Sequence, residues 1–271
     1  MEVRLQKILA QWGIASRREA EEMIRRSRVR INGVLAHLGQ KVNPQTDKIT
    51  VDGKPVVTKQ RPAITYLLLN KPAGVVSTCY DPQGRKTVLD LLPEELRQGS
   101  GIHPVGRLDT DSTGALLLTN DGELTFSLTH PSHSVPKTYS VLVKGHPSEV
   151  VLQIWRQGVL LEGRKTRPAQ VRLIESFSTN SRLEIVLKEG RNRQIRRIAE
   201  QLGYPVIELH RTAIGPIQLQ RPKQPYLKPG NYRSLKDDEM RFLQQQIKHT
   251  PIKDSAELRS VINHDMVQKK E

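Results

Sequence analysis

The sequence predicts an α+β fold: a small N-terminal unit followed by a larger domain with a mixed, mostly antiparallel sheet. A polar stretch at residues 57–62 separates two regions with different hydrophobic patterns and is typical of a linker. The first region has helical spacing followed by short alternating strands. The second alternates strands with short helices, without the even rhythm of repeated βαβ units. We expect domains at residues 1–60 and 63–236, and a C-terminal helix with a mobile tail at residues 237–271.

The N-terminal unit is expected to begin with two helices. Apolar residues at helical spacing over residues 5–12 predict the first, which Gly13 ends. Ser16 and Glu19 have the spacing of a capping box, in which each side chain accepts a hydrogen bond from the other residue's backbone. The second helix therefore begins at Ser16, with its buried stripe at Ala20, Met23 and Ile24.

Basic residues gather on one side of this unit. A strand over residues 28–31 alternates arginine with aliphatic residues before an Asn32-Gly33 turn, and a second hairpin closes around Asp52-Gly53. The alternative is an ordinary solvated surface, but we expect four of the arginines to lack an acidic neighbour one helical turn away. The predicted RNA-binding face contains Arg17, Arg18, Arg25, Arg26, Arg28 and Arg30.

The second region supplies the strands and helices of the larger domain. Apolar runs predict buried strands, and alternating runs predict half-buried ones. The expected strands are residues 63–70, 115–119, 137–144 and 182–188, and the expected helices are residues 149–155, 191–202 and 237–248. The last helix has an apolar stripe at Met240, Leu243 and Ile247.

The charge of the chain indicates a polyanionic partner. It carries 43 Lys and Arg against 28 Asp and Glu, a formal net charge of +15, and its pI is about 10.1. Nucleic acid fits this balance. A membrane surface is the alternative, but the sequence has no long apolar run, no signal-peptide pattern and no basic amphipathic helix of the interfacial type. We therefore expect a soluble, cytoplasmic protein.

Metal and disulfide chemistry is not expected. Cys79 is the single cysteine, which excludes a disulfide within the chain and a zinc site built on several cysteines. The eight histidines are scattered, without the spacing of a metal-binding helix. We expect no metal and no cofactor.

The segment that points to chemistry is a polar loop that leads into an apolar strand. It reads His103-Pro104-Val105-Gly106-Arg107-Leu108-Asp109-Thr110-Asp111-Ser112-Thr113-Gly114. An acid on such a loop can be presented rigidly. A carboxylate with an ordinary pKa of about 3.9 is ionised at neutral pH, so it can act as a nucleophile without a neighbouring base. Asp109 is the predicted nucleophile.

Two other interpretations fit parts of this loop. The order Asp109-x-Asp111-x-Thr113 matches magnesium-dependent phosphohydrolases, but those enzymes need an apolar strand before the first Asp, and here that strand comes afterwards. The other is an Asx turn, in which the carboxylate accepts from nearby backbone. The five residues alone favour that turn over catalysis.

The resemblance of longer stretches of the chain to known families favours catalysis by Asp109 over an Asx turn. Residues 3–60 resemble the S4 RNA-binding domain, which implies shape-based binding of structured RNA. Residues up to about 220 resemble pseudouridine synthases, specifically the RsuA and RluB-like ribosomal RNA branch that carries an S4 domain in front. Ala115 stands where that family more often has Leu. The shared motifs are Gly106-Arg107-Leu108-Asp109 with the following Leu-Leu-Leu-Thr-Asn-Asp-Gly, Leu69-Asn70-Lys71-Pro72-Ala73-Gly74-Val75-Val76-Ser77, Lys137-Thr138-Tyr139 and Glu189-Gly190-Arg191-Asn192-Arg193-Gln194-Ile195-Arg196-Arg197.

The resemblance implies roles for individual residues. Asp109 is the nucleophile of uridine isomerisation, at either the ribose or the ring, and Tyr139 stacks on the flipped-out base. Arg196 pairs with Asp109, with Arg191 as a second candidate. Arg107 binds phosphate or fills the space that the flipped nucleotide leaves.

The expected partner is structured RNA, most of all ribosomal RNA, and the basic run at residues 190–197 looks closer to the large-subunit members. We expect a monomer. The alternative function is a non-catalytic S4-type RNA-binding protein.

Overall fold

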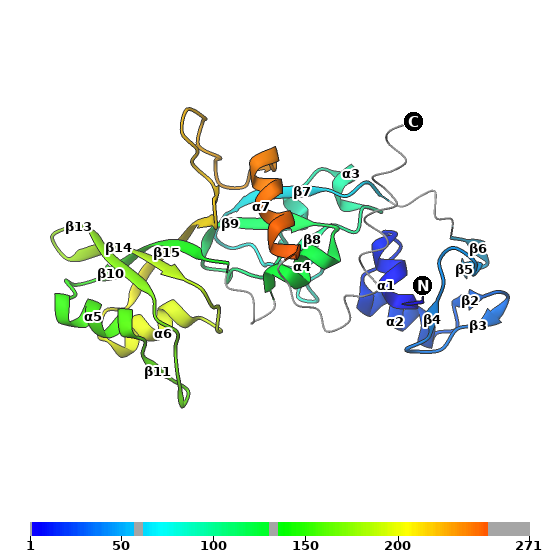
Figure 1. Cartoon of the computed structure of the whole chain (residues 1–271), viewed down its shortest axis with the longest axis horizontal. Helices are drawn as coiled ribbons and strands as arrows, with labels where there is room; N and C mark the ends of the chain where they lie inside the picture. The colour runs from blue at the N-terminus through cyan, green and yellow to red at the C-terminus, as the bar shows by residue number, and fades with distance from the viewer. Residues whose placement is uncertain (1, 57–61, 130–134, 249–271) are drawn as a thin grey trace.

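The computed structural model of the chain describes residues 2–56, 62–129 and 135–248, and Figure 1 shows a small N-terminal unit beside a larger one. The predicted linker lies almost wholly outside the described residues, as does the predicted tail after the last helix. None of the helices in the described residues has the length and apolar composition that a membrane-spanning segment requires.

The N-terminal unit contains the two predicted helices. The Glu19 backbone N–H donates to the Ser16 hydroxyl at 3.2 Å and the Ser16 N–H donates to the Glu19 carboxylate at 2.8 Å, which confirms the capping box. Gly13 follows the first helix with a φ of +70°. The elements are β1 (Val3–Arg4), α1 (Leu5–Gln11), α2 (Arg17–Arg25), β2 (Val29–Ile31), β3 (Val34–Leu35), β4 (Lys41–Val42), β5 (Ile49–Val51) and β6 (Lys54–Pro55).

The strands of this unit also follow the sequence pattern. Val29 and Ile31 are buried while Arg30 between them is exposed. Both predicted turns have positive φ at their two central residues, 52° and 85° at Asn32-Gly33 and 50° and 76° at Asp52-Gly53. These are the angles of a type I′ turn, which matches the twist of a two-strand hairpin.

The arginines of this unit are less free than predicted. The expectation that four of them lack an acidic neighbour one helical turn away was wrong, because Arg25 and Arg26 both pair with Glu22 of the same helix. Arg17 and Arg18, at the start of α2, are exposed and form no ion pair with any described residue. The ion pairs join Arg25 and Arg26 to Glu22, at 3.2 and 2.8 Å, and Arg28 to Asp52, at 2.5 Å.

The larger unit is built on a nine-stranded sheet. Its main path runs β13–β14–β10–β15–β9–β7–β17, with β16 paired to β15 and β8 paired to β9. All strand pairings but one are antiparallel, which confirms the predicted mixed, mostly antiparallel sheet. The strands are β7 (Tyr66–Lys71), β8 (His103–Pro104), β9 (Thr113–Thr119), β10 (Lys137–Lys144), β13 (Gln170–Ser176), β14 (Asn180–Leu187), β15 (Val206–Ile214), β16 (Ile217–Gln218) and β17 (Tyr232–Ser234).

The single parallel contact divides this sheet into two halves. β9 and β15 pair only through His210 with Thr113 and Arg211 with Gly114. Gly114 has a φ of +109°, and a Cβ there would lie 2.2 Å from the Arg211 carbonyl oxygen, so only glycine fits this approach. The contact brings the loop that precedes β9 next to the middle of β15, where the two halves meet.

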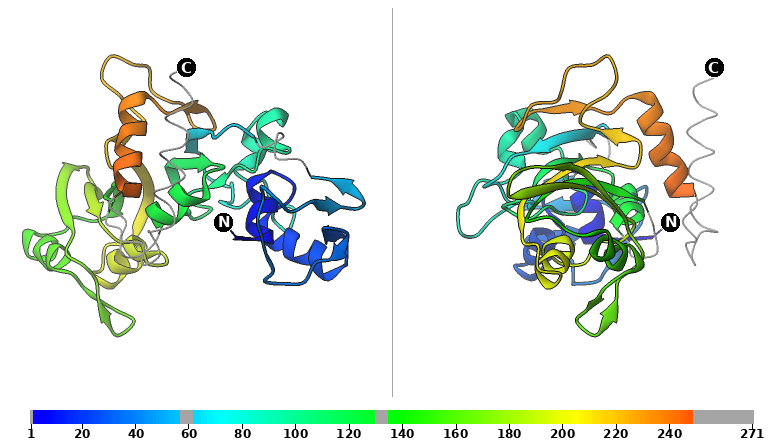
Figure 2. Two further views of the ribbon diagram at one scale, coloured as in Figure 1. Left: turned by 45° about the vertical axis from the view of Figure 1, so that its right-hand side comes forward. Right: turned by 90° about the vertical axis from the view of Figure 1, so that its left-hand side faces the viewer.

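Helices cover the two halves separately. Trp155 of α5 (Glu149–Gln157) and Ile198 of α6 (Gln194–Gln201) share one core with β10 and β14, and Figure 2 shows both helices on the same side of these strands. α4 (Gly122–Thr129) and α7 (Asp237–Lys248) pack on the other half. Leu243 of α7 is 1% exposed and lies in the core with Leu117, so this helix packs on the nine-stranded sheet. A 3-10 turn (Leu89–Leu91) and α3 (Glu94–Arg97) lie between β7 and β8.

Some boundaries differ from the prediction for local reasons. The strand at 137–144 and the helix at 237–248 match. The helix predicted from 191 begins only at Gln194, because Arg193 has left-handed backbone angles, φ 47° and ψ 32°. Strands β13 and β15 were not predicted.

Candidate active site

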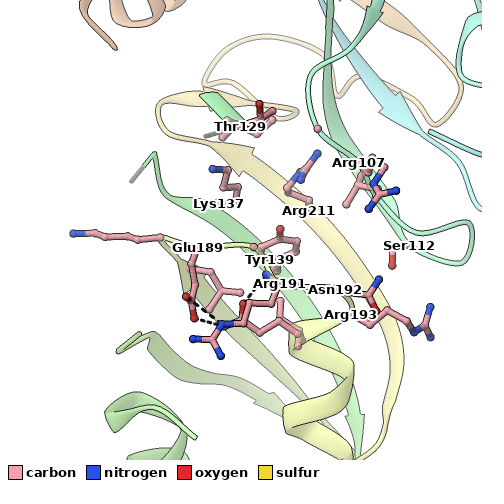
Figure 3. A pocket seen from close by; sticks show the side chains of 18 of the residues that line it. Arg107, Ser112, Thr129, Lys137, Tyr139, Glu189, Arg191, Asn192, Arg193 and Arg211 are labelled. Carbon is pink, nitrogen blue, oxygen red and sulfur yellow. Dashed lines mark hydrogen bonds and ion pairs between the residues drawn. The ribbon is translucent and has the colours of Figure 1, made fainter. Parts of the chain in front are cut away.

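A cavity of about 760 Å³ lies where the two halves of the sheet meet. The Gly106–Asp109 segment borders it on one side, and β10, β15 and the residues leading into α6 border it on the other (Figure 3). Small-molecule sites in proteins commonly have volumes of 300–1,000 Å³, so one nucleotide unit fits such a space.

Hydrogen bonds from the segment that follows β7 hold the Asp109 loop in place. The Ser77 hydroxyl donates to the Leu108 carbonyl at 2.8 Å and accepts from the Leu108 N–H at 3.2 Å. The Gly74 N–H donates to the Thr110 carbonyl at 2.8 Å. The motif at residues 69–77, which the sequence tied to the family without a role, thus holds the loop that carries the predicted nucleophile.

Lys71 adds a buried cation to this support. Its side chain is fully buried, and its ammonium donates to the carbonyls of Pro72 at 2.9 Å, Ser112 at 2.8 Å and Thr110 at 3.4 Å. Burial lowers the pKa of Lys71 to about 8, against the opposing pull of the loop carboxylates. The side chain is therefore still mostly charged at neutral pH, and two of its three acceptors, the carbonyls of Thr110 and Ser112, belong to the Asp109 loop.

The Asp109 carboxylate is half-buried and faces one arginine. The guanidinium of Arg193 lies 3.5 Å from Asp109 and 3.4 Å from Asp111, so it bridges the two acids. Among the described residues no backbone N–H donates to the Asp109 side chain, which is against the Asx-turn interpretation. The sequence pointed to the run that contains Arg193 but not to this residue.

The predicted arginine partners of Asp109 lie elsewhere. Arg196 contacts Asp111 instead, at 3.2 Å, and also the Ser112 hydroxyl at 3.3 Å. Arg191 donates to the carbonyls of residues 164 and 165, at 2.9 and 2.7 Å. The expected contact between Arg196 and Asp109 was wrong, because the left-handed turn at Arg193 points that side chain at Asp109 while Arg196 lies one helical turn further along.

Tyr139 and Arg107, to which the resemblance assigned contacts with the RNA, also line the cavity. Tyr139 is half-buried on β10 and packs against the hydrophobic clusters of both halves of the sheet. Arg107 is exposed beside Asp109. The cavity therefore combines an aromatic face, an acid and exposed cations.

The rim of the cavity carries further basic residues that the sequence did not single out. They lie on or just after a hairpin of β11 (Leu160–Leu161) and β12 (Arg164–Lys165), and just after the end of β14. Arg191 anchors the hairpin through its hydrogen bonds to the backbone of β12. The signal of these basic residues in the sequence was only a high local density of Lys and Arg. The rim residues are Arg164, Lys165, Arg167 and Lys188.

Comparisons with known proteins agree with this geometry. A family model described as RNA pseudouridylate synthase matches residues 65–201, and an S4 domain model matches residues 3–47. The chain belongs to the RNA pseudouridylate synthase family. This pseudouridine synthase is an isomerase with an S4 domain at its N-terminus. Its family membership excludes the phosphohydrolase interpretation of the Asp109 loop.

The relatives of this pseudouridine synthase match over nearly their whole length. It is 40% identical to a ribosomal large subunit pseudouridine synthase B from Bacillus subtilis, over 91% of this chain and 97% of the relative. It is also 40% identical to an uncharacterized RNA pseudouridine synthase from Aquifex aeolicus, over 89% and 93%. A crystal structure of a pseudouridylate synthase aligns with a TM-score of 0.63 and 31% identity, covering 89% of this chain and 99% of the other.

Proposed function

We propose that this enzyme converts a specific uridine of ribosomal RNA to pseudouridine, with Asp109 as the nucleophile on a flipped-out nucleotide. The observation that carries the proposal is the shared cavity of Asp109 and Tyr139. Two relatives named ribosomal large subunit pseudouridine synthase B favour large-subunit RNA as the substrate and the cytoplasm as the compartment.

The geometry supports a division of roles. Asp109 is ion-paired with Arg193, which orients the carboxylate for attack on carbon. Tyr139 offers a ring on which a base taken out of its stack can lie. Arg107, exposed at the mouth, contacts the backbone phosphate or fills the vacated place in the RNA.

The test is to map pseudouridine across ribosomal RNA from cells with and without the gene. We expect one or a few positions to lose the modification on deletion and to regain it with the wild-type gene but not with Asp109→Asn. Full modification of every position in the deletion strain, with no activity of the purified protein on that RNA, would refute the ribosomal substrate.

The two arginines near the acids should have separable effects. Arg193→Ala removes the cation that is ion-paired with Asp109, so single-turnover rates should fall about 10–100-fold with little change in melting temperature. Arg196→Ala should also lower the melting temperature, since Arg196 is mostly buried and binds the Ser112 hydroxyl. Arg197→Ala is the control, because Arg197 pairs with Glu162 away from both acids. A larger rate loss for Arg196→Ala than for Arg193→Ala would restore the arrangement that the sequence suggested.

Arg17 and Arg18, which form no ion pair with a described residue, should supply much of the contribution of the S4 domain to RNA affinity. Replacing Arg17 and Arg18 with Gln should make the log-log salt dependence of affinity shallower by about 1.4–1.8, because each lost phosphate contact contributes about 0.7–0.9. Arg28→Gln is the control, since Arg28 is already paired with Asp52, and it should change the slope less. Equal slopes for all three proteins would show that the start of α2 is only a solvated surface.

A further inference from the structure

Lys137 and Arg211 line the cavity, and neither forms an ion pair with Asp109 or Asp111. Lys137 and Tyr139 lie two residues apart on β10, and Arg211 is the residue directly opposite Tyr139 on β15. Residues two apart on a strand share a face, as do directly opposed residues of an antiparallel pair. The ring of Tyr139 is therefore flanked by Lys137 and Arg211 on one wall of the cavity (Figure 3).

Arg211 is held rigidly and yet keeps a free donor. Only 6% of the residue is exposed, and its Nε donates to the Ala115 carbonyl at 2.6 Å. Its Nη2 is buried and has no hydrogen-bond partner in the described part of the chain. An unpaired buried donor on a cation is costly, so such a group in a cavity wall indicates a missing acceptor.

Neither cation is neutralised by an acid in the described residues. Burial lowers the pKa of Lys137 to about 8, and the nearby charge of Arg211 lowers it further in the same direction. The carboxylates that line the cavity are already paired, Asp109 with Arg193 and Glu189 with Arg191. The wall beside Tyr139 thus keeps uncompensated positive charge that an anionic or strongly polar ligand can satisfy.

The reaction creates negative charge on the base itself. When the bond from C1′ to N1 breaks, both electrons stay on the uracil, and its charge is shared among N1, O2 and O4, while C1′ is bonded to an Asp109 oxygen. After the base turns, C5 attacks C1′, the electron pair of the C1′–O bond returns to Asp109, C5 loses its proton to solvent and N1 takes one up. If Asp109 instead attacks C6 of the ring, the displaced electron pair moves toward O4. In either route a carbonyl oxygen of the base carries the charge.

We propose that Lys137 and Arg211 bind the carbonyl oxygens of the uracil and stabilise the negative charge that the base carries during the reaction, an inference that rests on the proposed function. The alternative ligand is a backbone phosphate. The position of Arg211 favours the base, because it is buried beside the aromatic ring that would carry the base, while exposed cations for phosphate lie at the rim.

The test compares Lys137→Gln with the wild type on ribosomal RNA from the deletion strain, in single-turnover reactions. Lys137 is half-buried and its side chain makes no hydrogen bond or ion pair with a described residue, so the variant should fold. We expect RNA affinity within about threefold of wild type and a rate about 100-fold lower, the usual effect of losing one donor to a developing anion. Lys137→Arg should recover much of the rate.

A second substrate tests the charge on the base directly. Fluorine at C5 stabilises the uracil anion, so cleavage of the C1′–N1 bond in RNA containing 5-fluorouridine should depend less on Lys137. We expect the rate deficit of Lys137→Gln to be at least fivefold smaller on this RNA than on uridine RNA. Lys165→Gln removes an exposed cation of the same cavity and should change affinity and salt dependence instead.

The outcomes separate the possible failures. Equal deficits on both RNAs, or a loss of affinity with a shallower salt slope, would assign Lys137 to a phosphate and overturn the inference. A wild-type rate in Lys137→Gln would overturn it as well, even where Asp109→Asn is inactive. No conversion by the wild-type enzyme would instead count against the proposed function. Arg211→Lys keeps the charge but cannot both bind the Ala115 carbonyl and reach the base, so we expect an intermediate rate.

Discussion

Asp109→Asn is expected to abolish uridine isomerisation while leaving RNA binding nearly intact. The amide keeps the size of the side chain, but it lacks the negative charge required for attack on carbon. Turnover should fall below detection, and affinity should stay within about tenfold, or roughly 1.4 kcal/mol. Single-turnover assays on RNA from the deletion strain, with binding measured on the same RNA, would show this separation of chemistry from binding.

Asp111→Asn supplies the matched control. Asp111 lies on the same loop and shares Arg193, but its side chain is half exposed and is not among the residues that line the cavity. We expect it to slow the reaction only modestly. Appreciable turnover by Asp109→Asn, after mass spectrometry has excluded deamidation to Asp, would remove Asp109 from the nucleophile role. Combining Asp109→Asn with Arg193→Ala should lower turnover no further, since members of one catalytic unit do not act additively.

The elements that local pattern determines could be predicted from the sequence. The capping box at Ser16, the two type I′ turns and the strand at 137–144 each depend on residues close together in the chain, and the structure contains all of them. The parallel contact of β9 with β15 could not be predicted in this way. It joins residues almost a hundred positions apart through backbone atoms. The feature of the sequence that reflects this contact is the glycine at position 114.

The same distinction explains which site residues were found. Asp109 and Tyr139 belong to short motifs, so their sequence context was enough. The pairing of Asp109 with Arg193 depends on the left-handed backbone at Arg193, a conformation that arginine rarely adopts and that sequence spacing does not indicate. Arg211 lies on a strand that was not predicted, and its significance appears only through its position opposite Tyr139.

Lys71→Met is expected to have the second large effect, because the Lys71 ammonium holds the loop that carries Asp109, the proposed nucleophile. Methionine has a similar length but no donors, so the carbonyls of Pro72, Thr110 and Ser112 lose their shared partner. Each buried unpaired polar group costs about 1–3 kcal/mol, and water can replace only some of the bonds. We expect a loss of about 2–3 kcal/mol in the free energy of unfolding, measured by denaturant titration.

The effect of Lys71→Met on catalysis should exceed its effect on stability. The carbonyls of Thr110 and Ser112 belong to the loop that carries Asp109, and a shift of about 1 Å in a reacting group can reduce the rate about 100-fold. Under conditions in which the variant is fully folded, single-turnover rates should therefore fall by about this factor while RNA affinity is kept. Lys144→Met, at the exposed end of β10, controls for the loss of one lysine charge. A folded Lys71→Met protein with the wild-type rate would show that Ser77 and Gly74 alone hold the loop, and the buried cation would then serve only the stability of the domain.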